Sequence, residues 1–467
     1  MNDKARTVSR VLFFCVLSGI VVVALSVGVL WLKMNRDDRV ARVEIQKRLE
    51  AIRNAGQPLT AQDLAKLYPD PPPEHDAVLL LKQALAALVI PRDSTNLPFF
   101  GGKSWPKGTA PLEKAMLDEM QTWTEKNQKV FDTVSVEQLT GAWIGCSYSN
   151  GFTNLVHAPL SEISQLVKLL CLNAVLQAEL QHPKEAIQSL QKALAIGNAW
   201  RNDMPIHGFV KLATQRWICS TLDRVLNRTA IADSDLMSTS ASLTLTNLGT
   251  TKEFIINERC FGLSQASQLQ SLAKQATGHT FSLVRVLLKS YQARIIYRDQ
   301  DLLNYLESIE RCLATVDLPL SNTIPAILNI KRDSEKFWEK RHVNFLNTFK
   351  KERISLLSIS ESQIDMNLLS EADDITQIHV TRAALAVERW RLAHNSNVPN
   401  SLAELVPDYL SAVPIDPFDE QPLRYKKLAH GYVVYSIGSD FTDDGGKEKP
   451  ADAKDSDHYD ITFTVDR

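Results

Sequence analysis

The chain has 467 residues, of which 44% are hydrophobic and 23% are charged, and these proportions exclude a wholly disordered or collagen-like protein. Its 52 Lys and Arg residues nearly balance its 54 Asp and Glu residues, and the formal net charge of −2 argues against a dedicated nucleic-acid-binding protein. Only 18 residues are glycine, which favours a helical architecture. The length is enough for about three domains.

The first feature in chain order is an uncharged, apolar run over residues 11–32. About 20 apolar residues cross the hydrocarbon core of a membrane as one helix, which satisfies its own backbone groups. A cleaved signal peptide is the alternative, but its apolar region is normally about 7–15 residues long and ends at small residues. The run here is longer and ends in Leu30-Trp31-Leu32-Lys33. We therefore predict a transmembrane anchor at 11–32 that contacts membrane lipid.

The orientation of this anchor follows from the short segment before it. Basic residues lie on both sides of the run, so the charge bias alone does not decide. A tail as short as residues 1–10 is usually retained in the cytoplasm. We therefore expect a single-pass protein of the inner (cytoplasmic) membrane, with its soluble part outside the cytoplasm.

The pattern over residues 33–370 predicts one large helical domain, either a bundle or an irregular α-solenoid. Apolar residues recur there at helical spacing, as at Ile45, Leu49 and Ile52, and prolines and glycines separate the segments. Helices are expected at 39–54, 60–67, 77–90, 112–130, 161–198 (a hairpin), 208–228, 234–246, 251–275, 280–294, 298–315 and 333–357.

The hairpin at 161–198 is similar to one unit of a tetratricopeptide repeat. Ala186, Leu190 and Ala193 have the small–large–small spacing that lets two helices approach closely, and Ala174 occupies the small position of the first helix. A repeat array would make the protein a peptide-binding adaptor. No second unit follows in register, which favours a generic helical bundle.

An aromatic-rich segment lies between these helices. Trp143, Tyr148 and Phe152 occur with Cys146 among Gly, Ser and Asn residues, and they form either a binding surface or a plug at one end of a helical core. We favour the plug. The five cysteines after residue 33 are odd in number and form no CxxC pair, so the sequence predicts neither a metal-type cluster nor a disulfide framework.

The sequence favours a protein that is not an enzyme. It contains no HExxH, GxSxG or GxxxxGK[ST] motif, and its histidines are scattered singly. The alternative is an envelope hydrolase whose site is assembled from residues far apart in the chain. Glu258, Arg259, His157 and Trp143 are the polar and aromatic groups that would converge in such a site.

The residue pattern of the chain changes near residue 370, after which strand-forming segments occur. Asp373-Asp374 is a candidate cap for a helix over 375–394, and a short helix is expected over 402–409. Strands are expected over 423–427, 432–436 and 460–465, where β-branched and aromatic residues are dense. Three strands on one helix are a plausible independent unit. The sequence thus predicts a small α+β domain at 371–467 with a three-stranded antiparallel sheet.

This C-terminal stretch of about 90 residues resembles the C-terminal half of the major pseudopilin of type II secretion systems. The residues that carry the resemblance are Ala384 to Trp390, Asn400 to Leu410, Val413 to Pro417, Leu423 to Tyr425, Tyr435 to Asp440, Gly445-Gly446 and Asp460-Ile461. The resemblance implies a helix that supports an antiparallel sheet, and an acidic calcium-binding loop before the last strand. The chain departs from that family in its apolar run, which lies far upstream and contains no glutamate, and at Phe441, where the family usually has glycine.

The acidic loop suggests calcium by its composition as well. Eight acids and three lysines lie between residues 440 and 460, for a net charge of −5. Calcium binds through about six to eight oxygen ligands in flexible loops. Asp440, Asp443, Asp444 and Asp460 are the candidate ligands, and a solvated acidic loop without an ion is the alternative.

Together these observations predict a single-pass, membrane-anchored bacterial envelope protein with a structural or protein-interaction role. Its expected partners are membrane lipid and other envelope proteins, and not nucleic acid. The resemblance implies a link to type II secretion or pilus-like systems.

Overall fold

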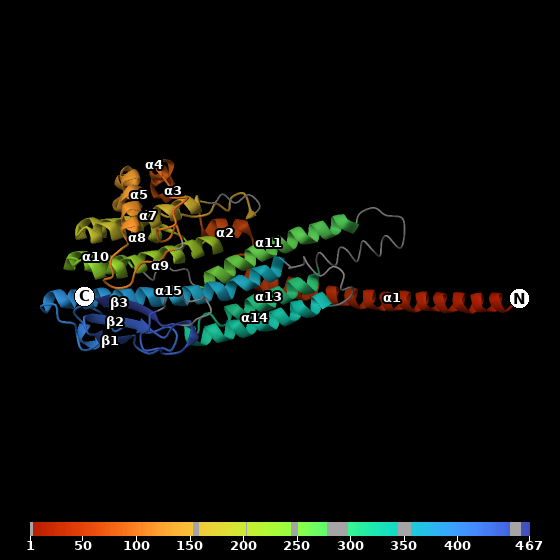
Figure 1. Cartoon of the computed structure of the whole chain (residues 1–467). Helices are drawn as coiled ribbons and strands as arrows, with labels where there is room; N and C mark the ends of the chain where they lie inside the picture. The colour runs from red at the N-terminus through yellow and green to blue at the C-terminus, as the bar shows by residue number, and fades with distance from the viewer. Residues whose placement is uncertain are drawn as a thin grey trace.

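The computed structural model describes residues 3–101, 103–152, 158–201, 203–243, 251–277, 298–343, 356–448 and 459–467. The molecule is elongated and mainly helical, with the first helix projecting at one end and the C-terminus at the other (Figure 1). The N-terminal part contains α1 (Asp3–Asn54), α2 (Ala61–Leu67), η1 (Pro73–His75), α3 (Ala77–Leu80), α4 (Lys82–Ala87), α5 (Lys114–Thr133) and α6 (Val136–Leu139).

The remaining elements follow in chain order. The centre contains α7 (Leu160–Glu179), α8 (Pro183–Ala199), α9 (Pro205–Arg228), α10 (Asp233–Ser242), α11 (Thr251–Thr277), α13 (Asp299–Leu313) and α14 (Leu320–Val343). The C-terminal part contains α15 (Leu356–Ala393), η4 (Leu402–Leu405), β1 (Arg424–Leu428), β2 (Gly431–Ser436), η5 (Gly438–Asp440) and β3 (Ile461–Asp466).

Helix α1 is a single helix of 52 residues, about 78 Å long. Its C-terminal half is a stem that lies against α13. Ala41 and Ile45 are buried there, and Arg42 forms an ion pair with Asp299 at 2.7 Å. Gly56 has φ +69°, the left-handed conformation that commonly follows a helix end, as its position after the periodic run predicts.

Among the residues that the structure describes, no helix has the length and apolar character needed to cross a membrane. Most side chains of 11–32 lie outside the described residues, so the anchor stays a prediction.

The hairpin predicted at 161–198 is confirmed as α7 and α8. Pro183 opens α8, and Gln181 in the turn has φ +61°. Ala174, Ala186, Leu190 and Ala193 are all completely buried. Helix α7 also packs against α9 and α5, so the small side chains lie inside a bundle of several helices (Figure 1).

Two hydrophobic cores run along the molecule. The larger one joins the bundle to the sheet, because Ile163 of α7, Leu222 of α9, Leu385 of α15, Val434 of β2 and Phe463 of β3 all belong to it and are 0% exposed. The second core is formed by the α1 stem with α11, α13, α14 and the first half of α15. Burial of this apolar surface is the main force that holds the helices and the sheet together.

Helix α15 belongs to both cores and runs lengthwise through the molecule (Figure 1). It packs against α9, α10, α11 and α14, and then against β2 and β3. The boundary expected between 370 and 371 lies inside this helix. The cap predicted at Asp373-Asp374 was wrong, because the Asp374 carboxylate lies in the middle of the helix and pairs with Arg216 at 2.7 Å.

The predicted three-stranded antiparallel sheet is confirmed, in the order β1-β2-β3. Val434 of β2 lies between Tyr425 of β1 and Phe463 of β3. The Tyr432 hydroxyl donates a hydrogen bond to the carbonyl oxygen of Ala384 at 3.0 Å, which fixes the sheet against α15.

Several predicted helices differ from the observed ones. The helix predicted over 77–90 is divided at Leu81, and the one expected over 402–409 is the single turn η4. Helix α14 begins before the predicted 333 and contains Pro325 in its first turns. The helix predicted over 280–294 lies outside the described residues.

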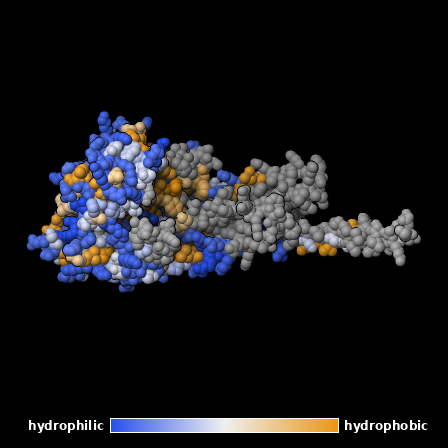
Figure 2. Space-filling view, viewed as in Figure 1, coloured by the Kyte–Doolittle hydropathy of each residue, from blue (hydrophilic) through white to orange (hydrophobic). Residues whose placement is uncertain are grey.

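The body exposes a mainly hydrophilic surface in the view of Figure 2, in which apolar residues are scattered or form small patches.

Candidate functional site

The four predicted calcium ligands lie around the end of the sheet where β2 leaves it and β3 enters it. The structure brings Asp444 and Asp460 together, because the two carboxylate oxygens of Asp460 accept hydrogen bonds from the backbone N–H groups of Asp444 at 3.2 Å and Gly446 at 2.7 Å. Gly446 has φ +77°, which favours glycine. Asp440 accepts from the N–H of Thr442 at 3.0 Å and so stabilises its own turn.

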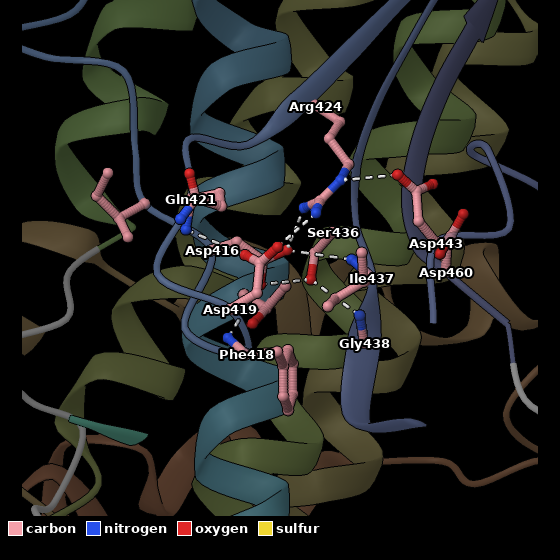
Figure 3. A network of polar contacts seen from close by, with 12 residues as sticks. Asp416, Phe418, Asp419, Gln421, Arg424, Ser436, Ile437, Gly438, Asp443 and Asp460 are labelled. Carbon is pink, nitrogen blue, oxygen red and sulfur yellow. Dashed lines mark hydrogen bonds and ion pairs between the residues drawn. The ribbon is translucent and has the colours of Figure 1, made fainter. Parts of the chain in front are cut away.

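The fourth predicted ligand, Asp443, is bound to a cation of the protein itself. Its Oδ2 accepts a hydrogen bond from Nε of Arg424 at 3.1 Å, and its Oδ1 accepts from the N–H of Gly445 at 2.9 Å. The Arg424 side chain leaves β1 and points into the acidic turns, so that its guanidinium also donates to Asp416 at 2.9 Å and to Asp419 (Figure 3). Arg424 therefore joins three carboxylates from two separate turns.

Asp416 is the centre of this network. Its side chain is 0% exposed, and its Oδ1 accepts from the Ser436 hydroxyl at 2.8 Å and the Phe418 N–H at 3.1 Å. Its Oδ2 accepts from the Ile437 N–H at 3.1 Å and from Arg424. A buried carboxylate needs this degree of hydrogen bonding and charge pairing, because its desolvation is otherwise very costly.

The local sequence explains why Asp416 lies there. It stands between Pro414 and Pro417, and proline disfavours the helical conformation of the residue before it. The chain turns back after Asp416, whose N–H donates to the carbonyl oxygen of Gln421 at 2.8 Å. The Phe418 side chain enters the second hydrophobic core, which anchors the turn to the helical body.

Two pKa shifts report the charge balance of the site. Burial lowers the pKa of the Arg424 guanidinium, but the hydrogen bond and charge of Asp419, with the charges of Asp416 and Asp443, raise it above its ordinary value overall. Burial raises the pKa of Asp460, and the two backbone N–H groups only partly oppose this. The guanidinium of Arg424 thus balances the charges of the carboxylates around it. The cost of burying the Asp460 carboxylate is only partly offset by its two backbone N–H partners.

A calcium ion at this site would need free oxygen ligands from the predicted acids. Among the described residues, no group of three or more His, Cys, Asp or Glu side chains is arranged to hold a metal ion. Both oxygens of Asp443 and of Asp460 already accept hydrogen bonds. Calcium binding at Asp440, Asp443, Asp444 and Asp460 stays a prediction, and at Asp443 and Asp460 an ion would have to share carboxylate oxygens that already accept these bonds.

The ion pair between Asp416 and Arg424 at the centre of this network was not predicted from the sequence. The stretch from Val413 to Pro417 was used for the family resemblance. The signal that pointed to the pair was the isolated acid beside the apolar Phe418 and an arginine eight positions later, since a buried acid requires a cationic or N–H partner.

The residues proposed for a hydrolase site have other contacts. The Arg259 guanidinium donates to Gln57 at 2.8 Å and to the carbonyl oxygen of Pro58 at 3.0 Å. Trp143 stacks with His75, and the Arg201 guanidinium lies over the Trp143 ring. Glu258 is 2% exposed. His157 lies outside the described residues.

Three residues of the aromatic segment, Cys146, Tyr148 and Phe152, belong to a small core. Cys146 and Tyr148 are buried in a cluster with α2, and Phe152 packs against them. Behind them Asp203 accepts from Nδ1 of His207 at 2.7 Å and from the N–H of Cys146 at 2.6 Å. A histidine paired with a carboxylate can serve in acid–base catalysis. Burial raises the pKa of the nearby Cys146 thiol to about 12, which favours the protonated form of this thiol.

Comparison of the chain with family models, curated proteins and solved structures gives no match.

Proposed function

We propose that this protein is a single-pass, membrane-anchored bacterial envelope protein with a structural or protein-interaction role, linked to type II secretion or a pilus-like system. Membrane lipid contacts residues 11–32, and other envelope proteins contact the part outside the cytoplasm. The uncharged run at 11–32 supports the anchor, since its length suits the hydrocarbon core. The hydrophilic face in Figure 2 agrees with a body that lies outside the lipid.

The interaction role is supported by the continuous packing of the protein from the α1 stem to the sheet. The stem packs in the second core, α15 links that core to the first, and the sheet packs on α15 and α9. Ion pairs fix the stem laterally, as between Asp38 and Arg298 at 3.2 Å. Such a molecule presents the sheet at a set distance from its N-terminal helix (Figure 1). A rigid support for a small domain suits docking to a partner.

The anchor is tested by membrane fractionation of cells that express the full chain or a variant without residues 1–33. We expect the full chain in the membrane fraction after a carbonate wash and the shortened chain in the supernatant. Recovery of the full chain in the supernatant would contradict the anchor.

The interaction role is tested by a photo-crosslinking amino acid at Lys426, which is exposed on β1. We expect a discrete adduct with another envelope protein in intact cells. The matched control places the same group at Gln121, an exposed position on α5. Adducts of equal yield at both positions, or none at either, would contradict docking through the sheet.

A further inference from the structure

We propose that the guanidinium of Arg424 is the resident cation of the acidic C-terminal turns, so that this part of the protein folds without a bound calcium ion. The proposal concerns the chemistry of the turns and holds independently of the membrane role.

The acids of the two turns converge on Arg424. A calcium ion in such a loop would draw together carboxylates from separate turns. Arg424 already does so, because three different nitrogen atoms of its guanidinium donate to three different acids: Nη1 to Asp416 at 2.9 Å, Nε to Asp443 at 3.1 Å, and Nη2 to Asp419 (Figure 3). The planar guanidinium has five N–H donors in a fixed fork, a geometry that lysine lacks.

The carboxylate oxygens of Asp416 and Asp460 already accept hydrogen bonds from the protein. Asp416 accepts four hydrogen bonds through its two oxygens, from two backbone N–H groups, the Ser436 hydroxyl and Arg424. Asp460 accepts two backbone N–H groups. Calcium requires about six to eight oxygen ligands, and here it would compete with Arg424 and with the backbone N–H groups for carboxylate oxygens that already hold both turns closed.

Burial makes this pairing important. The Asp416 side chain is completely buried and is paired with Arg424, whose side chain is 22% exposed and is paired also with Asp419 and Asp443. Removal of one partner leaves the other charge uncompensated, which is strongly destabilising. The pair is therefore a requirement for this end of the sheet to fold.

The test is the thermal unfolding of the full chain, purified in detergent and freed of metal, with either EDTA or 2 mM calcium chloride. We expect the same melting temperature in both conditions and no saturable calcium binding by titration calorimetry. The variant Arg424→Met is expected to melt several degrees lower than the wild type in EDTA. Arg424→Lys keeps the charge but not the forked set of N–H donors, so its melting temperature should lie between those of the wild type and Arg424→Met.

The control is Arg332→Met, because Arg332 is exposed on α14 and its change should leave the melting temperature unaltered. A calcium-dependent rise in the wild-type melting temperature, or a calorimetric calcium isotherm, would overturn the proposal. So would an Arg424→Met variant as stable as Arg332→Met. If Arg424→Met fails to fold, the melting temperature of Arg424→Lys is compared with those of the wild type and Arg332→Met.

Discussion

Asn227 of α9 donates a hydrogen bond from its side-chain Nδ2 to the carbonyl oxygen of Thr464 in β3, at 2.7 Å and across 237 positions of the chain. The Asn227 Oδ1 accepts from the N–H of Asp466 at 2.8 Å, and Asp223 one turn earlier accepts from the N–H of Thr464 at 3.2 Å. These side chains occupy the outer edge of β3 in the way that another strand would. The helical body thus closes one edge of the sheet, which otherwise would present unpaired backbone groups.

This relationship predicts that Asn227→Ala destabilises the protein. The change removes two partly buried hydrogen bonds to β3, each worth about 0.5–1.5 kcal/mol. We expect the free energy of unfolding to fall by about 1–3 kcal/mol in urea denaturation. The control is Asn329→Ala, because Asn329 is exposed on α14. An Asn227→Ala variant that matches this control would contradict the role of Asn227.

The contact between Asn227 and β3 could not be predicted from the sequence. The strands and most helices follow from local periodicity, and they were predicted to within a few residues. Which helix covers which sheet edge depends on contacts between residues more than 200 positions apart, and no local pattern encodes them. The same limit explains the wrong cap at Asp373-Asp374, because Asp374 has the residue type of a cap but is held in mid-helix by Arg216.

The candidate site was predicted in part. The acidic composition located the turns between β2 and β3 correctly, and the two glycines at 445 and 446 have positive φ as their turn role requires. The pattern of acids indicated calcium, with a solvated loop as the alternative, and did not indicate an arginine among them. Only the fold shows that Arg424 on the neighbouring strand reaches Asp443, which lies 19 positions later.

A second prediction concerns the close approach of α11 and α13. The side chain of Tyr305 lies over Gly262, where an added Cβ would be 2.7 Å from Cε1 of the ring and nearer still to its hydroxyl end. The Tyr305 hydroxyl donates to the carbonyl oxygen of Glu258 at 2.8 Å, so the ring cannot move without loss of that bond. We expect Gly262→Ala to lower the free energy of unfolding by about 1–3 kcal/mol, the usual cost of overpacking.

A double-mutant cycle separates this overlap from any effect on the helix itself. In a Tyr305→Ala background, which removes the ring, Gly262→Ala should cost less than half of what it costs in the wild type. An equal cost in both backgrounds, measured by urea denaturation, would show that Tyr305 is not the obstacle.

A third prediction concerns the reactivity of the cysteines. Burial raises the pKa to about 12 for the four thiols of Cys146, Cys171, Cys219 and Cys260. Because the thiolate is the reactive form, the folded protein should resist iodoacetamide at pH 8 at all four positions and react fully in urea. The measurement is peptide mass spectrometry in a Cys15→Ser background. A cysteine introduced at the exposed Ser401 serves as the reactive control, and labelling of any of the four at its rate would contradict the prediction.

The last prediction is a pH dependence that belongs to Glu258. This side chain is 2% exposed on α11, and burial raises its pKa from 4.5 to about 8. The folded state therefore holds the proton more tightly than the unfolded state does. The contribution of this proton to stability is fully present below pH 4.5 and is lost as the pH rises through 8, with a slope of at most about 1.4 kcal/mol per pH unit.

The Glu258→Gln variant isolates this effect, because the amide has nearly the same shape and does not titrate. Other buried acids contribute to the wild-type curve, so the quantity to follow is the difference in the free energy of unfolding between wild type and variant from pH 5 to pH 9. We expect the wild type to lose stability relative to Glu258→Gln across this range. The exposed Glu335→Gln change on α14 should give a flat difference. A flat difference for Glu258→Gln as well would mean that Glu258 is as readily ionised in the folded chain as in the unfolded one.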